Sequence, residues 1–74
     1  MANENIKELL DEFHYHEMLD RLHMILSISE DHLLQHPVAK VERDVKQNIE
    51  KALEHLAEAY QITGNISHKR FNDE

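Results

Sequence analysis

The residues best suited to chemistry are aromatic and cationic side chains near the two ends of the chain. Tyr15 and His16 lie in an early aromatic segment, Arg21 follows them, and Tyr60 comes late in the sequence. Aromatic rings stack on nucleobases and cations form charge-assisted bonds to phosphates, so these residues indicate a site for a nucleobase-phosphate ligand. The competing interpretation is that the rings cap a core and that Arg21 pairs with Asp20 or a carboxylate on a neighbour. The wider group also includes Phe13, His14, Lys69, Arg70 and Phe71.

The seven histidines are the residues that a metal site would use. His32 and His36 stand at i, i+4, and His16, Asp20 and His23 offer a second such helical face. The sequence has no HExxH motif and no Glu-x-x-His pair, so we interpret these side chains as solvated or hydrogen-bonded. We expect no metal and no other cofactor.

Carboxylates recur along the second half of the chain at Glu50, Glu54 and Glu58, with Lys46 and Lys51 beside them. This spacing is typical of an exposed helix face that carries ion pairs. No obvious nucleophile or oxyanion site accompanies the carboxylates, so the sequence predicts no catalytic residues and no enzyme.

A second basic set, formed by Lys40, Arg43 and Lys46, is interrupted by Glu42 and Asp44 and could equally be a mixed-charge surface. The net charge of −7 opposes binding to a long nucleic acid, which requires many cations to meet phosphates. A few local cations can still hold a small phosphate-bearing ligand.

Two long helices are expected to position these residues. Apolar residues at three- and four-residue steps predict a first helix over about 5–36, with Asn5 and Glu8 as a capping box. Pro37 ends this helix, and a cleaner stripe predicts a second helix over about 39–63, which Gly64 ends in the left-handed conformation. We therefore expect an all-α fold, with a helical hairpin over 1–64 and a polar C-terminal tail over 65–74.

A short turn makes the two helices antiparallel. With the turn centred near Val38, Tyr15 should lie beside Tyr60 and Gln61, and Arg21 beside His55.

The first helix is apolar along two lines, of which a single partner helix can cover only one. The first line, expected to face the second helix, contains Tyr15, Met18, Leu22 and Ile25, and the other contains Leu19, Leu26 and Leu33. The second line predicts another subunit, and hence a homo-oligomeric helical bundle.

The sequence contains no Cys, so neither a disulfide nor a thiolate zinc site can stabilise so small a domain. The first residues are acidic and amphipathic, unlike a secretory signal, and no apolar run is long enough to cross a bilayer. We expect a cytoplasmic protein that does not bind a membrane.

Several short motifs occur across residues 13–64. They are Phe13-His14-Tyr15-His16-Glu17, the following Arg21, His36-Pro37, and Leu56-Ala57-Glu58-Ala59-Tyr60-Gln61 with Gly64. Together these motifs, which span most of residues 13–64, resemble the helical-hairpin family of phage sponges that sequester the cyclic oligonucleotide signals of CBASS and Thoeris defence.

This resemblance implies a multimer of hairpins that binds cyclic di- or trinucleotides between subunits without turnover, in the host cytoplasm if the protein is phage-encoded. Tyr15 would stack on a base, Arg21 would bind a phosphate, and Arg43 would be a further basic contact. The alternative hypothesis is a small helical adaptor or inhibitor, which would bind a protein partner through the Leu19, Leu26 and Leu33 line of the first helix.

Overall fold

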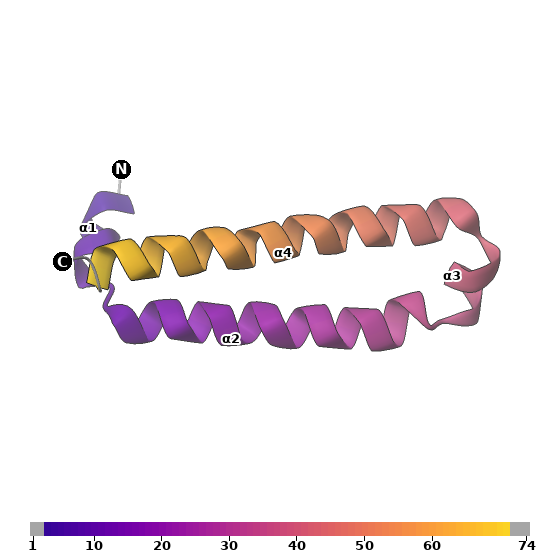
Figure 1. The fold of residues 1–74 in the computed structure, drawn as a ribbon, viewed down its shortest axis with the longest axis horizontal. Coiled ribbons are helices and arrows are strands. Elements are labelled where there is room, and N and C mark those ends of the chain that lie inside the picture. The colour runs from indigo at the N-terminus through magenta and orange to yellow at the C-terminus, as the bar shows by residue number, and fades with distance from the viewer. Residues whose placement is uncertain (1–2, 72–74) are drawn as a thin grey trace.

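The computed structural model describes residues 3–71, and the side chains of residues 6–71. Two long helices run side by side in opposite directions (Figure 1): α2 spans Glu12–Ser29 and α4 spans Arg43–Phe71. A short helix α1, Asn3–Leu9, precedes them and lies at the end of the molecule where α4 stops. The described residues contain helices and no strand, which confirms the all-α prediction.

The chain bends between α1 and α2, within the segment that we had predicted as one helix. Asp11 is the N-cap of α2: its carboxylate accepts from the backbone N–H of His14 at 3.2 Å, and Nδ1 of His14 accepts from the backbone N–H of Asp11 at 3.1 Å. This reciprocal pair is a capping box in which His takes the place of the usual Glu or Gln. The predicted box at Asn5 was wrong, because Asn5 lies inside α1.

The turn is longer than predicted because it contains a helix of its own. After α2 the chain continues as one π-helical segment, η1, Glu30–Leu34. His36 then caps α3, Pro37–Val41, by accepting from the backbone N–H of Val38 at Nδ1, 3.1 Å away. The long second helix therefore begins at Arg43 instead of residue 39.

The C-terminal end of α4 also differs from the prediction. Gly64 does not have a positive φ, and α4 continues through it to Phe71. Residues 65–71 are therefore helical, and they contain the buried Ser67 and the half-buried Arg70 and Phe71. Contacts of these last turns with α1 and α2 offset the cost of a helical glycine, which is about 1 kcal/mol.

The interior of the single chain is small. Among the described side chains, Leu22 and Ala39 are the only buried apolar ones. The accessible surface is 6324 Å², whereas a compact monomer of this mass, 8.8 kDa, exposes about 4,800 Å². The radius of gyration of 16.0 Å likewise exceeds the value of about 11 Å for a compact chain of this length.

The expected division of the first helix into an inner and an outer apolar line holds only in part. Leu22 is buried, Tyr15 is half-buried and Leu33 is exposed, as expected, but four other positions differ from the prediction. Leu19 and Leu26 are half-buried, whereas Met18 and Ile25 are 52% and 47% exposed. The seam between α2 and α4 is centred on Leu22, and this position turns Leu19 and Leu26 toward α4. Met18 and Ile25 lie on the opposite flank of Leu22 and face outward.

Among residues 3–71, no helix combines the length and the hydrophobicity that crossing a bilayer requires.

Candidate functional site

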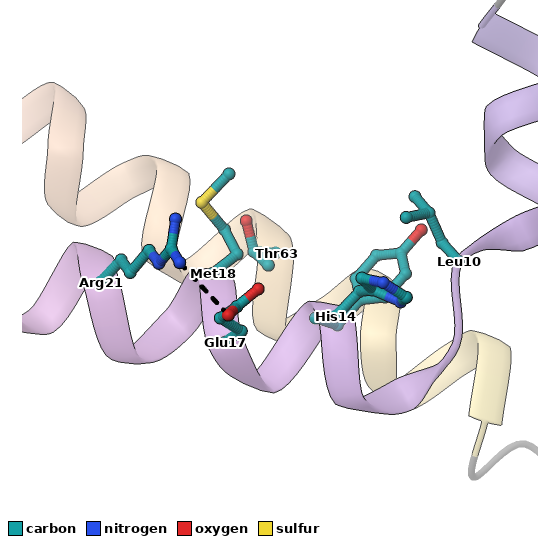
Figure 2. A pocket seen from close by; sticks show the side chains of 7 residues that line it. Leu10, His14, Glu17, Met18, Arg21 and Thr63 are labelled. Atoms are coloured by element: carbon teal, nitrogen blue, oxygen red, sulfur yellow. Dashed lines mark hydrogen bonds and ion pairs between the residues drawn. The ribbon is translucent and has the colours of Figure 1, made fainter.

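A cavity of about 330 Å³ lies between the first turns of α2 and the C-terminal part of α4. Figure 2 shows the side chains around it, with Met18 and Arg21 projecting to the same side of α2, near Thr63 of α4. The cavity brings together two of the residues predicted from the sequence, Tyr15 and Arg21. The remaining lining residues are Leu10, His14, Glu17, Met18 and Thr63.

Tyr15 is held by the last turn of α4. Nη1 of Arg70 donates to the Tyr15 hydroxyl at 3.1 Å, and the Arg70 guanidinium carbon lies 5.8 Å from the centre of the Tyr15 ring. The ring of Phe71 meets that of Tyr15 edge-on, with centroids 5.5 Å apart. These contacts fix the orientation of Tyr15, which an aromatic stacking residue requires.

Arg70 also connects α4 to α1. Its Nη2 donates to the backbone carbonyl of Lys7 at 2.7 Å, so one guanidinium spans three helices. Within the described residues, the acceptors of Arg70 are a hydroxyl and a carbonyl, and no carboxylate forms a salt bridge with it. Its positive charge is therefore not neutralised by an ion pair there.

Arg21 is paired with a carboxylate of its own helix. Nη2 of Arg21 lies 3.2 Å from Oε2 of Glu17, one turn earlier, and both side chains are largely exposed. The competing interpretation expected a carboxylate partner for Arg21, but at Asp20 or on a neighbour instead of at Glu17. An exposed pair of this kind contributes about 0–1 kcal/mol, so an anionic ligand could displace Glu17 at small cost.

The other predicted residues lie elsewhere. His16 is exposed, with Nε2 3.7 Å from a carboxylate oxygen of Glu12, and it does not line the cavity. Tyr60 is half-buried and does not line the cavity either. Arg43 is the first residue of α4, at the opposite end of a molecule 48 Å long.

The register of α4 against α2 explains why Tyr60 does not line the cavity. Tyr15 meets Arg70 and Phe71 instead of Tyr60 and Gln61, and Arg21 shares its cavity with Thr63 instead of lying beside His55. The first shift is roughly three helical turns along α4 and the second roughly two. Because α3 lengthens the turn, residues farther toward the C-terminus reach the level of Tyr15.

Asp11 positions His14 at the edge of the cavity through the capping box. The backbone N–H of His14 donates to the Asp11 carboxylate, and this hydrogen bond holds the pKa of Asp11 below its usual range. His14 Nδ1 is also 2.8 Å from an Asp11 carboxylate oxygen. The cap therefore fixes the start of α2, and Tyr15 lies in the first turn of that helix.

A second groove, of about 610 Å³, lies between α2, η1 and the middle of α4. Its lining includes the carboxylates Glu30, Glu50 and Glu54 together with His23. Within residues 6–71, no group of three or more His, Asp or Glu side chains is arranged to hold a metal ion. The negative charge of this groove disfavours an anionic ligand there.

Arg70 is the residue of the site that sequence reasoning undervalued, because it was assigned to a polar tail. The signal was present: Ile62 and Ile66, at i and i+4, continue the helical apolar spacing past Gly64. Arg70 stands one turn beyond Ile66, inside the same helix.

Comparison with protein-family models, curated proteins and solved structures found no match to this chain. The functional proposal therefore rests on the geometry of the cavity and on the motifs of the sequence.

Proposed function

We propose that this protein is a non-catalytic sponge that binds and sequesters cyclic oligonucleotide immune signals. The observation that carries the proposal is that Tyr15 and Arg21 line one cavity, while a second guanidinium, that of Arg70, is bonded to the Tyr15 hydroxyl. A fixed aromatic ring beside two cations suits a base linked to a phosphate. Such contacts supply affinity, which is all that sequestration requires.

We further propose that the working unit is a homo-oligomer of α2–α4 hairpins, in the host cytoplasm if the protein is phage-encoded. A cavity of about 330 Å³ is at the small end of ligand pockets, so one chain can enclose only part of a cyclic di- or trinucleotide. A second subunit would surround the rest. A symmetric interface also suits a ligand that is itself nearly symmetric.

The net charge of −7 is compatible with this proposal because the charges are unevenly placed. Three carboxylates line the groove between α2 and the middle of α4, whereas the Tyr15 cavity contains the Arg21–Glu17 pair and adjoins Arg70. A small anion that approaches the cavity therefore encounters the neutral Arg21–Glu17 ion pair and the positive charge of Arg70.

The alternative, a helical adaptor that binds a protein partner, is favoured by the exposed apolar side chains of α2. The surface would then differ from the predicted one, because Leu19 and Leu26 are half-buried and Met18 and Ile25 are exposed. Substitution of Ile25 would disrupt such a complex, and substitution of Arg21 would leave it intact.

Isothermal titration with a panel of cyclic di- and trinucleotides tests the sponge proposal. Arg21→Ala should weaken binding on the order of tenfold to a hundredfold, since a hydrogen bond to a charged group contributes about 1.5–3 kcal/mol. Lys51→Ala, on the exposed surface of α4, is the control with the same change in net charge. Equal losses in the two variants would contradict the proposed role of Arg21.

The Arg43→Ala variant tests whether the other end of a hairpin contributes to ligand binding. Arg43 is too far from the cavity of its own chain to contact a ligand there. Unchanged affinity would remove it from the binding residues, and a loss matching that of Arg21→Ala would mean that a second subunit supplies it.

A further inference from the structure

The hairpin has two faces of different character, one on either side of the seam at Leu22. His23 and Glu30 of α2, with Glu50 and Glu54 of α4, line the acidic groove and mark one face. At 100° per residue, six of the eight large apolar side chains that remain exposed on α2 and α4 fall on the opposite side, and the other two, Phe13 and Met24, do not. We call that opposite side the apolar face: Met18, Ile25 and Ile28 of α2, and Val45, Ile62 and Ile66 of α4.

We infer that the apolar face is the surface on which a second copy of this chain packs. Each of its six side chains is between 43% and 54% exposed, so the face resembles a helix-bundle core opened along its middle. Large apolar side chains exposed on one side of two helices mark an interaction surface.

The surface area leaves room for a permanent partner, which we take to be another copy. The chain exposes about 1,500 Å² more than a compact monomer of its mass, whereas a standard interface removes about 800 Å² per partner. With only Leu22 and Ala39 as buried apolar side chains among those described, the folded chain needs its partner at all times. A copy of itself is the one partner always present where the chain is made.

Charge distribution favours the same pairing. Two chains that each carry a net charge of −7 repel one another. This repulsion is weakest when the surfaces that meet contain few carboxylates. The apolar face is flanked by Arg21, already neutralised by Glu17, whereas the opposite groove carries Glu30, Glu50 and Glu54. Packing on the apolar face leaves the acidic groove of each chain in water.

This inference deepens the proposed function, because the Tyr15 cavity opens on the same face. Met18 belongs to the apolar face and lines the cavity next to Arg21 (Figure 2). A second copy seated there adds a wall that the single chain lacks. The binding site is thus incomplete until two chains associate, although their association requires no ligand.

Light scattering over a dilution series, without ligand, tests the inference. Wild type should have the mass of two chains or a multiple of it, and Ile25→Lys should raise the dissociation constant on the order of tenfold or more. Met24→Lys is the matched control, because Met24 is the adjacent residue, is 52% exposed and lies outside the apolar face. Both variants make the same change in net charge.

Thiol labelling covers the case in which Ile25→Lys fails to fold. The chain has no native Cys, so Ile25→Cys and Met24→Cys each introduce a single thiol. The thiol at position 25 should react slowly at high protein concentration and faster on dilution, whereas the thiol at position 24 should react fast throughout.

A wild-type mass of one chain with native helicity, or equal reactivity of the two thiols, would overturn the inference. Because no nucleotide is present, these results are independent of ligand binding. A dimer that binds no nucleotide would contradict the sponge proposal alone.

Discussion

Arg70, in the last turn of α4, donates a hydrogen bond of 3.1 Å to the hydroxyl of Tyr15, in the first turn of α2. The same guanidinium donates at 2.7 Å to the carbonyl of Lys7 in α1. One side chain therefore connects the last turn of α4 to both α1 and α2. It also places a cation against the aromatic ring to which we assign base stacking.

Replacing Arg70 should loosen this end of the molecule. We expect Arg70→Ala to lower the free energy of unfolding by about 1–2 kcal/mol, because two hydrogen bonds from a half-buried cation are lost. Urea denaturation followed by circular dichroism measures the change. Lys69→Ala, at the exposed neighbouring position, removes the same charge and should have little effect. Equal stability of the two variants would contradict the role given to Arg70.

Substitution of Gly64 tests whether α4 is continuous or ends at residue 63. A Cβ at Gly64 meets no atom within 4 Å, and its φ is not positive, so Gly64→Ala should stabilise the protein by about 0.5–1 kcal/mol. Thermal unfolding measures the gain. Ala52→Gly, at an exposed position of the same helix, should cost a similar amount and calibrates the comparison. Destabilisation by Gly64→Ala would indicate a left-handed helix cap instead.

Asp11 should make the stability of α2 depend on acid pH. Its pKa is lowered in the folded chain by the hydrogen bond from the His14 backbone, so the stabilisation is complete above the ordinary value of 3.8. It is lost as the pH falls through the lower pKa of the folded state. Asp11→Asn retains an N-cap side chain without a titrating group, and should flatten this part of the pH profile.

Helicity followed during an acid titration of wild type and Asp11→Asn would check this expectation. Profiles that fall in parallel over that pH range would assign the acid sensitivity to other carboxylates.

Much of the helical content could be predicted from the sequence, because apolar spacing is a local signal that extends over many residues. The same reasoning misplaced the end of the second helix at Gly64, since residue propensity carries no information about the contacts that Ser67, Arg70 and Phe71 make across the molecule. The bend before Asp11 was missed because its cap uses a histidine three residues later.

The candidate site could be predicted only in part. Tyr15 and Arg21 line one cavity, but their role in binding a ligand stays a prediction. Which residues of α4 would face them depended on the length of the turn, and the α3 helix within it is encoded by the cap from His36 and by Pro37. The outward position of Met18 and Ile25 likewise depends on where the seam falls around α2, which periodicity alone does not determine.

Sequestration without turnover is the central claim, and ligand recovery tests it most directly. A limiting amount of each cyclic di- or trinucleotide is mixed with excess protein, the free ligand is quantified after filtration, and the protein is then denatured to release what it holds. The account predicts that one of these nucleotides disappears from the filtrate and returns in full, chemically intact, after denaturation. If every nucleotide stays in the filtrate, or if one returns cleaved, the protein is not a sponge for these signals.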